Sequence, residues 1–239
     1  MRRLREVTVT APTELGAADG LAYAFWMPPA PPSGGVLILH GAGSCKESHF
    51  DFARAAVARG MAALAFDQRG HGESGGRMGA GVLEDISAMG TLLRERVARE
   101  RLPMAIRGSS LGGYLALLSA RPVRAHAVVA ICPASGEGLL RGLRQGGLRF
   151  EADVPALEAF LTERDLRAAA SELEMPVLLL HAEGDEQVPV EHSRELAALL
   201  RHRSSRLIAV PVGHHRSVQH DAELQAASLR FIERALGRS

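Results

Sequence analysis

The chain has 239 residues, a hydrophobic fraction of 46% and a formal net charge of +1. This length supports one large core, so we expect a single domain over residues 1–239. The near-neutral charge favours neither nucleic acid nor an anionic membrane, no apolar run spans a bilayer, and the charged N-terminus lacks signal-peptide features. We therefore expect a cytoplasmic protein, monomeric or a small homo-oligomer, without nucleic-acid or membrane partners.

Apolar strand-like runs alternate with helix-like segments along the chain. An antiparallel pair is expected to open the sheet, and a stiff proline-rich loop follows it at 28–32. The predicted strands are 5–10, 21–27, 36–40, 61–67, 104–107, 127–131, 177–181 and 206–210. The predicted helices are 48–59, 82–99, 111–121, 191–201 and 221–236. The inner strands are continuous apolar runs, which is typical of parallel strands covered by helices on both faces.

One long segment interrupts this alternation. Residues 133–175 contain no convincing strand, and 136–149 is rich in glycine and arginine. We expect residues 138–170 to form a small insertion of one or two helices over the end of the sheet. Such insertions often act as lids or binding loops. Arg141, Arg144 and Arg149 are interpreted as a solvated helix face, with recognition of an acidic substrate as the alternative.

The pattern G-x-S-x-G occurs at Gly108–Gly112, between a strand-like and a helix-like run. A serine in such a strand-to-helix turn has its hydroxyl exposed, and the glycines allow the tight turn. Ser110 is therefore the candidate nucleophile. Ser74 satisfies the same pattern, but no helix begins after it, so we interpret its segment as a polar turn.

Ligands of open parallel sheets bind at the carboxyl ends of the strands. Glycines after strand 36–40 expose backbone amides, and the Ala42 amide is a candidate oxyanion donor together with that of Leu111. Asp185 follows strand 177–181, with Glu183 and Glu186 as alternatives. His214 and His215 follow strand 206–210, and either histidine could serve as general base for Ser110.

Two further groups of residues were considered for metal or disulfide chemistry. The spacing of His192, His202 and His220 matches no strong ligand pattern, so we expect no metal site. We also expect no cofactor, because hydrolysis through a serine nucleophile needs none. Cys45 and Cys132 each follow a predicted strand. Whether they pair stays open, and free thiols are favoured.

Taken together, these segments resemble the α/β-hydrolase superfamily over nearly the whole chain. The resemblance rests on residues 40–43, 67–74, the turn at Ser110, Gly184–Asp185 followed by Val188–Pro189, and 213–215. It implies an eight-stranded, mostly parallel sheet and a triad of Ser110, Asp185 and His215, because the family's glycine-to-histidine spacing favours His215 over His214. Residues 46–50 resemble small bacterial carboxylesterases and cinnamoyl (feruloyl) esterases.

The implied function is hydrolysis of a small-molecule carboxylic ester through an acyl-enzyme. A thioesterase, a peptidase or a perhydrolase would use the same machinery, and a non-catalytic ligand-binding protein on this fold is the alternative from another class.

Overall fold

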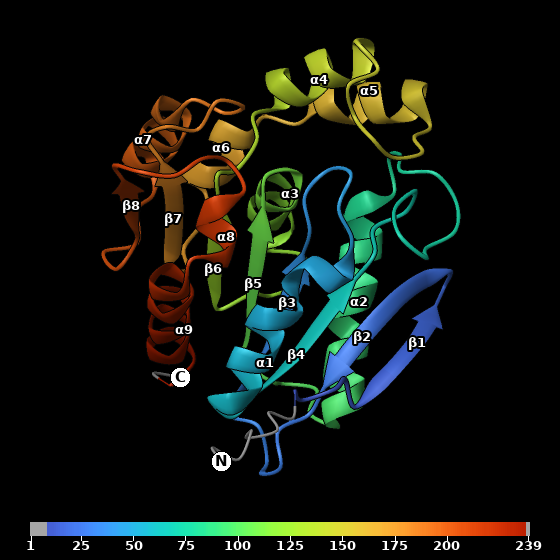
Figure 1. The fold of residues 1–239 in the computed structure, drawn as a ribbon, viewed down its shortest axis with the longest axis vertical. Coiled ribbons are helices and arrows are strands. Elements are labelled where there is room, and N and C mark those ends of the chain that lie inside the picture. The colour runs from blue at the N-terminus through green and yellow to red at the C-terminus, as the bar shows by residue number, and fades with distance from the viewer. Residues whose placement is uncertain (1–8, 238–239) are drawn as a thin grey trace, which may run out of the picture.

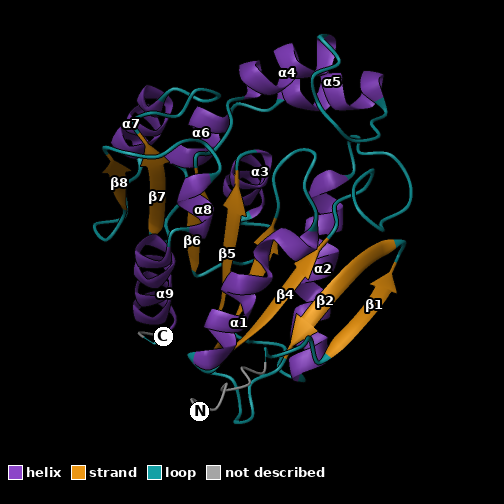
Figure 2. Ribbon diagram, in the orientation of Figure 1, coloured by secondary structure: helices purple, strands orange, loops and turns teal. Residues whose placement is uncertain are grey.

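The computed structural model describes residues 9–237, which form an eight-stranded sheet with helices on both sides (Figures 1 and 2). The strands are β1 (Glu14–Ala18), β2 (Leu21–Trp26), β3 (Gly34–Leu39), β4 (Met61–Phe66), β5 (Met104–Ser109), β6 (Ala127–Ile131), β7 (Val177–Ala182) and β8 (Arg206–Val210). The helices are η1 (Lys46–His49), α1 (Phe50–Ala58), α2 (Val82–Val97), α3 (Leu111–Ser119), α4 (Gly136–Arg144), α5 (Val154–Glu163), α6 (Leu166–Ser171), α7 (Val190–Leu199), α8 (Ser217–His220) and α9 (Ala222–Leu236). None of these helices is long and apolar enough to cross a membrane.

The strand order is β1-β2-β4-β3-β5-β6-β7-β8. The pairs β1·β2 and β2·β4 are antiparallel, whereas every pair from β4 to β8 is parallel. This confirms the expected α/β fold with a mostly parallel sheet. The central position of β5 places the residue that follows it, Ser110, near the middle of the sheet's carboxyl edge.

Both faces of the sheet are buried, which explains its continuous apolar strands. Alternate side chains of β3 point to opposite faces. Leu37 and Leu39 join the core cluster that contains Ile86 of α2. Val36 and Ile38 join the cluster that contains Phe52 of α1 and the apolar side of α9. Helices therefore cover the side chains on both faces of the inner strands. For this reason the inner strands are apolar throughout and do not alternate apolar with polar residues.

The prediction for the first strand was wrong. Most of segment 5–10 lies outside the described residues, and residues 9–10 are not in a strand. The antiparallel partner of β2 is instead β1, joined to it by Asp19 and Gly20. Both residues have positive φ, 50° and 78°, as a type I′ turn requires. The Asp-Gly pair between apolar residues was the signal that the sequence interpretation overlooked.

Three helices, α4 to α6, occupy the segment in which one or two were expected. We call residues 136–171 the α4–α6 segment. Figure 1 shows α4 and α5 beyond the carboxyl end of β5, toward which the arrow of that strand points. Leu139, Leu143 and Phe160 are buried there and belong to the core cluster of α2 and α3. That residues 138–170 form a separate cap stays a prediction.

Candidate active site

Ser110 lies in a strained turn between β5 and α3. Its φ of 53° and ψ of −117° are unusual for a residue with a side chain. The turn is tight enough to require glycine at two positions. A Cβ at Gly108 would lie 2.0 Å from the Gly112 carbonyl oxygen, and one at Gly112 would lie 2.5 Å from the carbonyl oxygens of Leu39 and His40. The geometry is that of the expected strand-turn-helix motif.

Asp185 and His215 form a buried hydrogen-bonded pair. His215 Nδ1 donates to Asp185 Oδ2 over 2.7 Å, and the carboxylate side chain is fully buried. His181 Nε2 lies 3.2 Å from the same oxygen, and the amides of Gln187 and Val188 donate to Oδ1, each over 2.9 Å. Burial by itself would raise the pKa of Asp185, but these donors outweigh it and hold the pKa well below the ordinary value. The carboxylate is therefore charged at neutral pH.

The orientation of His215 leaves its Nε2 available for proton transfer, because Nδ1 is bound to Asp185. Among the described residues, no hydrogen bond joins His215 to Ser110. Both residues nevertheless line one cavity. Hydrogen bonds of catalytic groups are often long without substrate.

This cavity has a volume of about 570 Å³, within the range of small-molecule sites. It opens at the carboxyl edge of the sheet, beneath the α4–α6 segment. Its walls come from the loop after β3, the β5–α3 turn, α4 and the loop that follows it, and the loops after β7 and β8. Apart from Ser110 and His215, its polar or charged lining residues are Ser44, Ser109, Ser135, Arg141, Gln145, Arg149, Gln187, His192, Arg216 and Gln219.

The two candidate oxyanion donors differ in their relation to the cavity. Ala42 lines the cavity together with Ser110, whereas Leu111 directly follows Ser110 as the first residue of α3 and does not line the cavity. Neither backbone amide donates to an acceptor in the part of the chain described. Unpaired backbone amides of this kind can stabilise an oxyanion where they face the reacting carbonyl.

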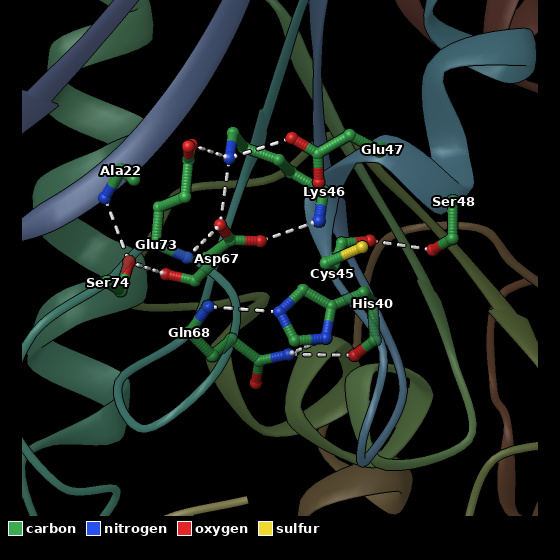
Figure 3. Close-up of polar contacts among 10 residues, drawn as sticks. All are labelled: Ala22, His40, Cys45, Lys46, Glu47, Ser48, Asp67, Gln68, Glu73 and Ser74. Carbon is green, nitrogen blue, oxygen red and sulfur yellow. Dashed lines mark hydrogen bonds and ion pairs between the residues drawn. The ribbon is translucent and has the colours of Figure 1, made fainter.

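A buried ion pair fastens the loop that carries Ala42. Lys46 Nζ donates to Asp67 Oδ2 over 2.9 Å, and the Lys46 amide donates to Asp67 Oδ1 over 2.7 Å; Figure 3 shows both contacts. Lys46 and Asp67 are 2% and 0% exposed, and Glu73 adds a contact to Nζ of 2.6 Å. One residue further along, Gln68 holds His40 at the other end of the loop, through its amide to Nε2 and its side chain to the carbonyl oxygen.

The turn that contains Ser74 belongs to this fastening. Ser74 Oγ donates to the Asp67 carbonyl oxygen over 2.5 Å and accepts from the Ala22 amide over 2.8 Å (Figure 3). Ser74 does not line the cavity. Its hydroxyl is thus used to join the loop after β4 to β2, which agrees with its interpretation as a polar turn.

Arg107 connects the strand of the candidate nucleophile to the helix after His215. Its side chain is 1% exposed and its guanidinium lies 3.9 Å from the Phe52 ring centroid. It donates to the Gln219 carbonyl oxygen in α8 and to His49 Nδ1, each over 3.0 Å. Burial lowers the pKa of Arg107 to about 10, so the group stays charged at neutral pH.

The alternative acids and bases of the sequence interpretation lie elsewhere. Glu183 is bound to Arg194 over 2.9 Å, and Glu186 is exposed. His214 is exposed and its amide donates to Ser217 Oγ. Of the three candidate acids, Asp185 is the one that contacts a histidine of the loop after β8, and that histidine is His215.

The described residues contain one group with three possible metal ligands, Cys132, Asp185 and His215, whose ligand atoms lie within 4.8 Å of one another. Two of those atoms are already bound to each other, and burial raises the pKa of the Cys132 thiol, which disfavours the thiolate. His192, His202 and His220 do not join this group. Cys45 and Cys132 are both free thiols.

Comparison with known proteins fits this geometry. Residues 30–150 match the model of the family Hydrolase_4, described as serine aminopeptidase, S33. The chain belongs to this family. The region of this chain that matches the S33 family model includes the loop of Ala42, the turn of Ser110 and part of the α4–α6 segment. Asp185 and His215 lie beyond it, so their assignment depends on the geometry above.

Relatives of this S33 family member are distant. The uncharacterized protein YfhR of Escherichia coli K12 is 24% identical over 223 residues, which cover 84% of this chain and 72% of YfhR. A monoacylglycerol lipase of Paleococcus ferrophilus has a TM-score of 0.71 at 20% identity, covering 92% of this chain and 99% of the lipase. Est1E of Butyrivibrio proteoclasticus has a TM-score of 0.72 at 18% identity, covering 95% and 100%. These structures share the α/β-hydrolase fold.

Several cavity residues were missed in the sequence interpretation. Arg216 directly follows His215, and Gln187 lies two residues after Asp185, so their closeness to candidate residues was a usable signal. His192 was considered only as a metal ligand, yet it lines the cavity and its Nε2 is buried without a partner among the described residues.

Proposed function

We propose that this S33 family member is a carboxylic ester hydrolase that works through an acyl-enzyme at Ser110. The observation that carries the proposal is the 2.7 Å hydrogen bond from His215 to the buried Asp185, with His215 and the strained Ser110 lining one cavity. Several structural neighbours are described as an esterase or a lipase, which agrees with an ester substrate.

The reaction begins when Ser110 Oγ attacks the ester carbonyl carbon and its proton moves to His215 Nε2. The amides of Ala42 and Leu111 donate to the resulting oxyanion, which is worth roughly 3 kcal/mol per donor in such sites. The bond to the alcohol oxygen then breaks, and His215 gives its proton to that oxygen. Asp185 stabilises the imidazolium while it exists.

The second half of the reaction releases the acid. Water gives a proton to His215 Nε2 as its oxygen attacks the acyl carbon, and the bond to Ser110 Oγ breaks as this proton passes to the serine. The free enzyme and a carboxylic acid result. Because no step requires a metal, we expect a chelator to leave the rate unchanged.

The family description makes an aminopeptidase the second candidate function. Such an enzyme must hold the ammonium group of a peptide N-terminus, and a carboxylate is the usual partner for that charge. None of the described residues that line the cavity is Asp or Glu, whereas three are Arg. This charge pattern favours the esterase.

The first experiment measures hydrolysis of p-nitrophenyl esters from acetate to palmitate by the wild type. Ser110→Ala and His215→Ala should each lower kcat by roughly 10⁴-fold or more, because nucleophile and base act as a unit. His214→Ala, at an exposed residue that does not line the cavity, is the matched control and should retain activity. Activity in Ser110→Ala would overturn the proposal. Hydrolysis of aminoacyl p-nitroanilides but not of esters would favour the aminopeptidase.

A further inference from the structure

The cavity beside Ser110 is lined by cations without a balancing carboxylate. Arg141, Arg149 and Arg216 line it, and none of the other described lining residues is Asp or Glu. The chain as a whole carries a formal net charge of only +1. The positive charge is therefore concentrated at the candidate active site and does not reflect an overall basic protein.

The three arginines come from different parts of the fold. Arg141 lies on α4, Arg149 in the loop between α4 and α5, and Arg216 in the loop after β8, next to His215. Their side chains are exposed. Among the described residues, no hydrogen bond or ion pair engages any of the three guanidinium groups. Their donors are available to a ligand.

Neighbouring arginines of the same region are used differently. Arg144, three residues after Arg141 on α4, donates to Glu158 of α5 over 2.6 Å. Arg167 of α6 is paired with Glu195 of α7. These ion pairs connect helices outside the cavity. The α4–α6 segment therefore contains two kinds of arginine. Arg144 and Arg167 form ion pairs between helices, whereas Arg141 and Arg149 line the cavity.

Three like charges around one cavity repel one another, and an anion between them would relieve that repulsion. A guanidinium also binds carboxylate or phosphate through paired N–H donors, with greater strength than neutral hydrogen bonds. We propose that the substrate is an anionic ester, whose carboxylate or phosphate is held by Arg141, Arg149 and Arg216 while Ser110 attacks its carbonyl. This inference rests on the proposed esterase function and specifies its substrate class.

The anion can belong to the acyl group or to the alcohol, and paired substrates distinguish the two. Mono-4-nitrophenyl glutarate is compared with 4-nitrophenyl pentanoate, which has the same acyl chain length without the charge. For the alcohol side, 3-(butyryloxy)benzoate, which carries a carboxylate on the leaving phenol, is compared with the neutral methyl 3-(butyryloxy)benzoate. For each pair the quantity measured is the ratio of kcat/KM for the anionic to the neutral ester.

Arg141→Gln, Arg149→Gln and Arg216→Gln are measured beside the control Arg144→Gln, whose ion pair lies outside the cavity. We expect the wild type to prefer the anionic member of at least one pair. Each cavity variant should reduce that preference at least about fivefold, as the loss of one charge-assisted contact predicts, and the control should not. Because each ratio is taken within one variant, general damage to catalysis cancels.

Two results would overturn the inference. One is a wild type that prefers the neutral ester of both pairs. The other is an anionic preference that survives in all three cavity variants as it does in Arg144→Gln. Added salt provides an independent readout, because the preference should fall between about 0.05 M and 0.5 M NaCl if it is electrostatic.

A binding measurement separates this inference from the proposed function. If the wild type hydrolyses no ester, the esterase proposal fails, but titration calorimetry with glutarate and with glycerol 3-phosphate still tests the site. Binding to the wild type that is lost in the triple Gln variant would support the anion site. No binding of either anion to the wild type would overturn it.

Discussion

The carboxylate of Asp185 has its donors arranged on both oxygens. His215 and His181 lie at Oδ2, and two backbone amides donate to Oδ1. The amides belong to the turn that begins at Asp185, so the residue fixes its own loop while it orients the histidine. A substitution at this position is consequently expected to act on both the proposed chemistry and the fold.

Asp185→Asn should lower kcat by roughly 10⁴-fold, because an amide cannot stabilise the imidazolium and would favour the other tautomer of His215. The measurement is the steady-state hydrolysis of a p-nitrophenyl ester. Glu183→Gln, which removes a surface partner of Arg194, is the matched control and should have a normal rate. Equal effects of the two variants would contradict the role proposed for Asp185.

The same variant should change the acid sensitivity of the fold. The pKa of Asp185 is depressed in the folded state, so its carboxylate stabilises the protein above the unfolded pKa near 4, and this stabilisation declines as pH falls below that value. The difference in unfolding free energy between wild type and Asp185→Asn should therefore be constant at neutral pH and decrease on acidification. Urea denaturation at several pH values measures it, and a difference that grows toward acid pH would contradict the linkage.

At the scale of residues, chain order predicted that the candidate catalytic groups gather at one edge of the sheet, whereas the choice of His215 over His214 came from the family resemblance and agrees with the bond to Asp185. Ser110, Asp185 and His215 each follow a different parallel strand, and the carboxyl ends of such strands share one edge. The direction of single side chains could not be predicted. Arg141 and Arg144 lie on the same helix, and only the position of α5 determines that Arg144 meets Glu158 while Arg141 faces the cavity.

At the scale of elements, the loop from β3 to α1 is held in place by contacts to the loop after β4. Lys46, the only lysine of the chain, has its charge buried against Asp67. Burying a charge carries a large desolvation cost, which the attraction of the opposite charge offsets. Removal of one partner therefore leaves the other charge buried and unpaired. The other two carboxylates that contact Lys46, those of Glu73 and Glu47, belong to side chains that are largely exposed, so Asp67 is the fully buried partner of the lysine.

Lys46→Met should lower the free energy of unfolding by about 3–5 kcal/mol, as expected when one member of a buried pair is lost. Arg144→Met is the matched control, because its ion pair with Glu158 is 61% and 37% exposed and should contribute less than about 1 kcal/mol. Urea denaturation measures both. A loss in Lys46→Met no larger than that in the control would show that the buried pair does not stabilise the loop.

Elements with strong local signals were predicted and the others were not. The inner strands and α2, α3 and α9 lie within a few residues of their expected bounds. The first strand was misplaced because alternation at 5–10 was given more weight than the Asp19–Gly20 turn. One or two helices were expected within residues 138–170 without bounds, and the cap that starts α4, Ser135 accepting from the Gly138 amide over 3.0 Å, lies before that range.

At the scale of the whole molecule, the fold contains several histidines that burial keeps neutral. Burial lowers the pKa of His40 to about 4 and that of His49 well below its ordinary value, where the charge of Arg107 adds to the effect. The pKa values of His71 and His192 are lowered by burial as well. His40 Nε2 accepts from the Gln68 amide, a bond that protonation would break.

These histidines should make the fold sensitive to mild acid. Their folded pKa values lie below the unfolded value of about 6.5, so the unfolded state binds more protons as pH falls from there. The contribution is fully present above that pH and is lost on acidification, at about 1.4 kcal/mol per pH unit for each proton of difference. The unfolding free energy from urea titrations should therefore decrease steeply between about pH 7.5 and pH 5.

His71→Phe isolates one of these groups, since the ring of His71 stacks on Phe150 at 4.3 Å and a phenyl ring can keep that contact. In this variant the slope of unfolding free energy against pH should decrease by up to about 1.4 kcal/mol per pH unit, which is the contribution of one proton. His214→Gln, which changes an exposed histidine, is the control and should retain the wild-type slope. A wild-type unfolding free energy that does not change with pH in this interval would show that the buried histidines do not make the fold sensitive to mild acid. Equal slopes in the two variants would show that His71 does not contribute, and the acid sensitivity would then have to come from other groups, such as the carboxylates.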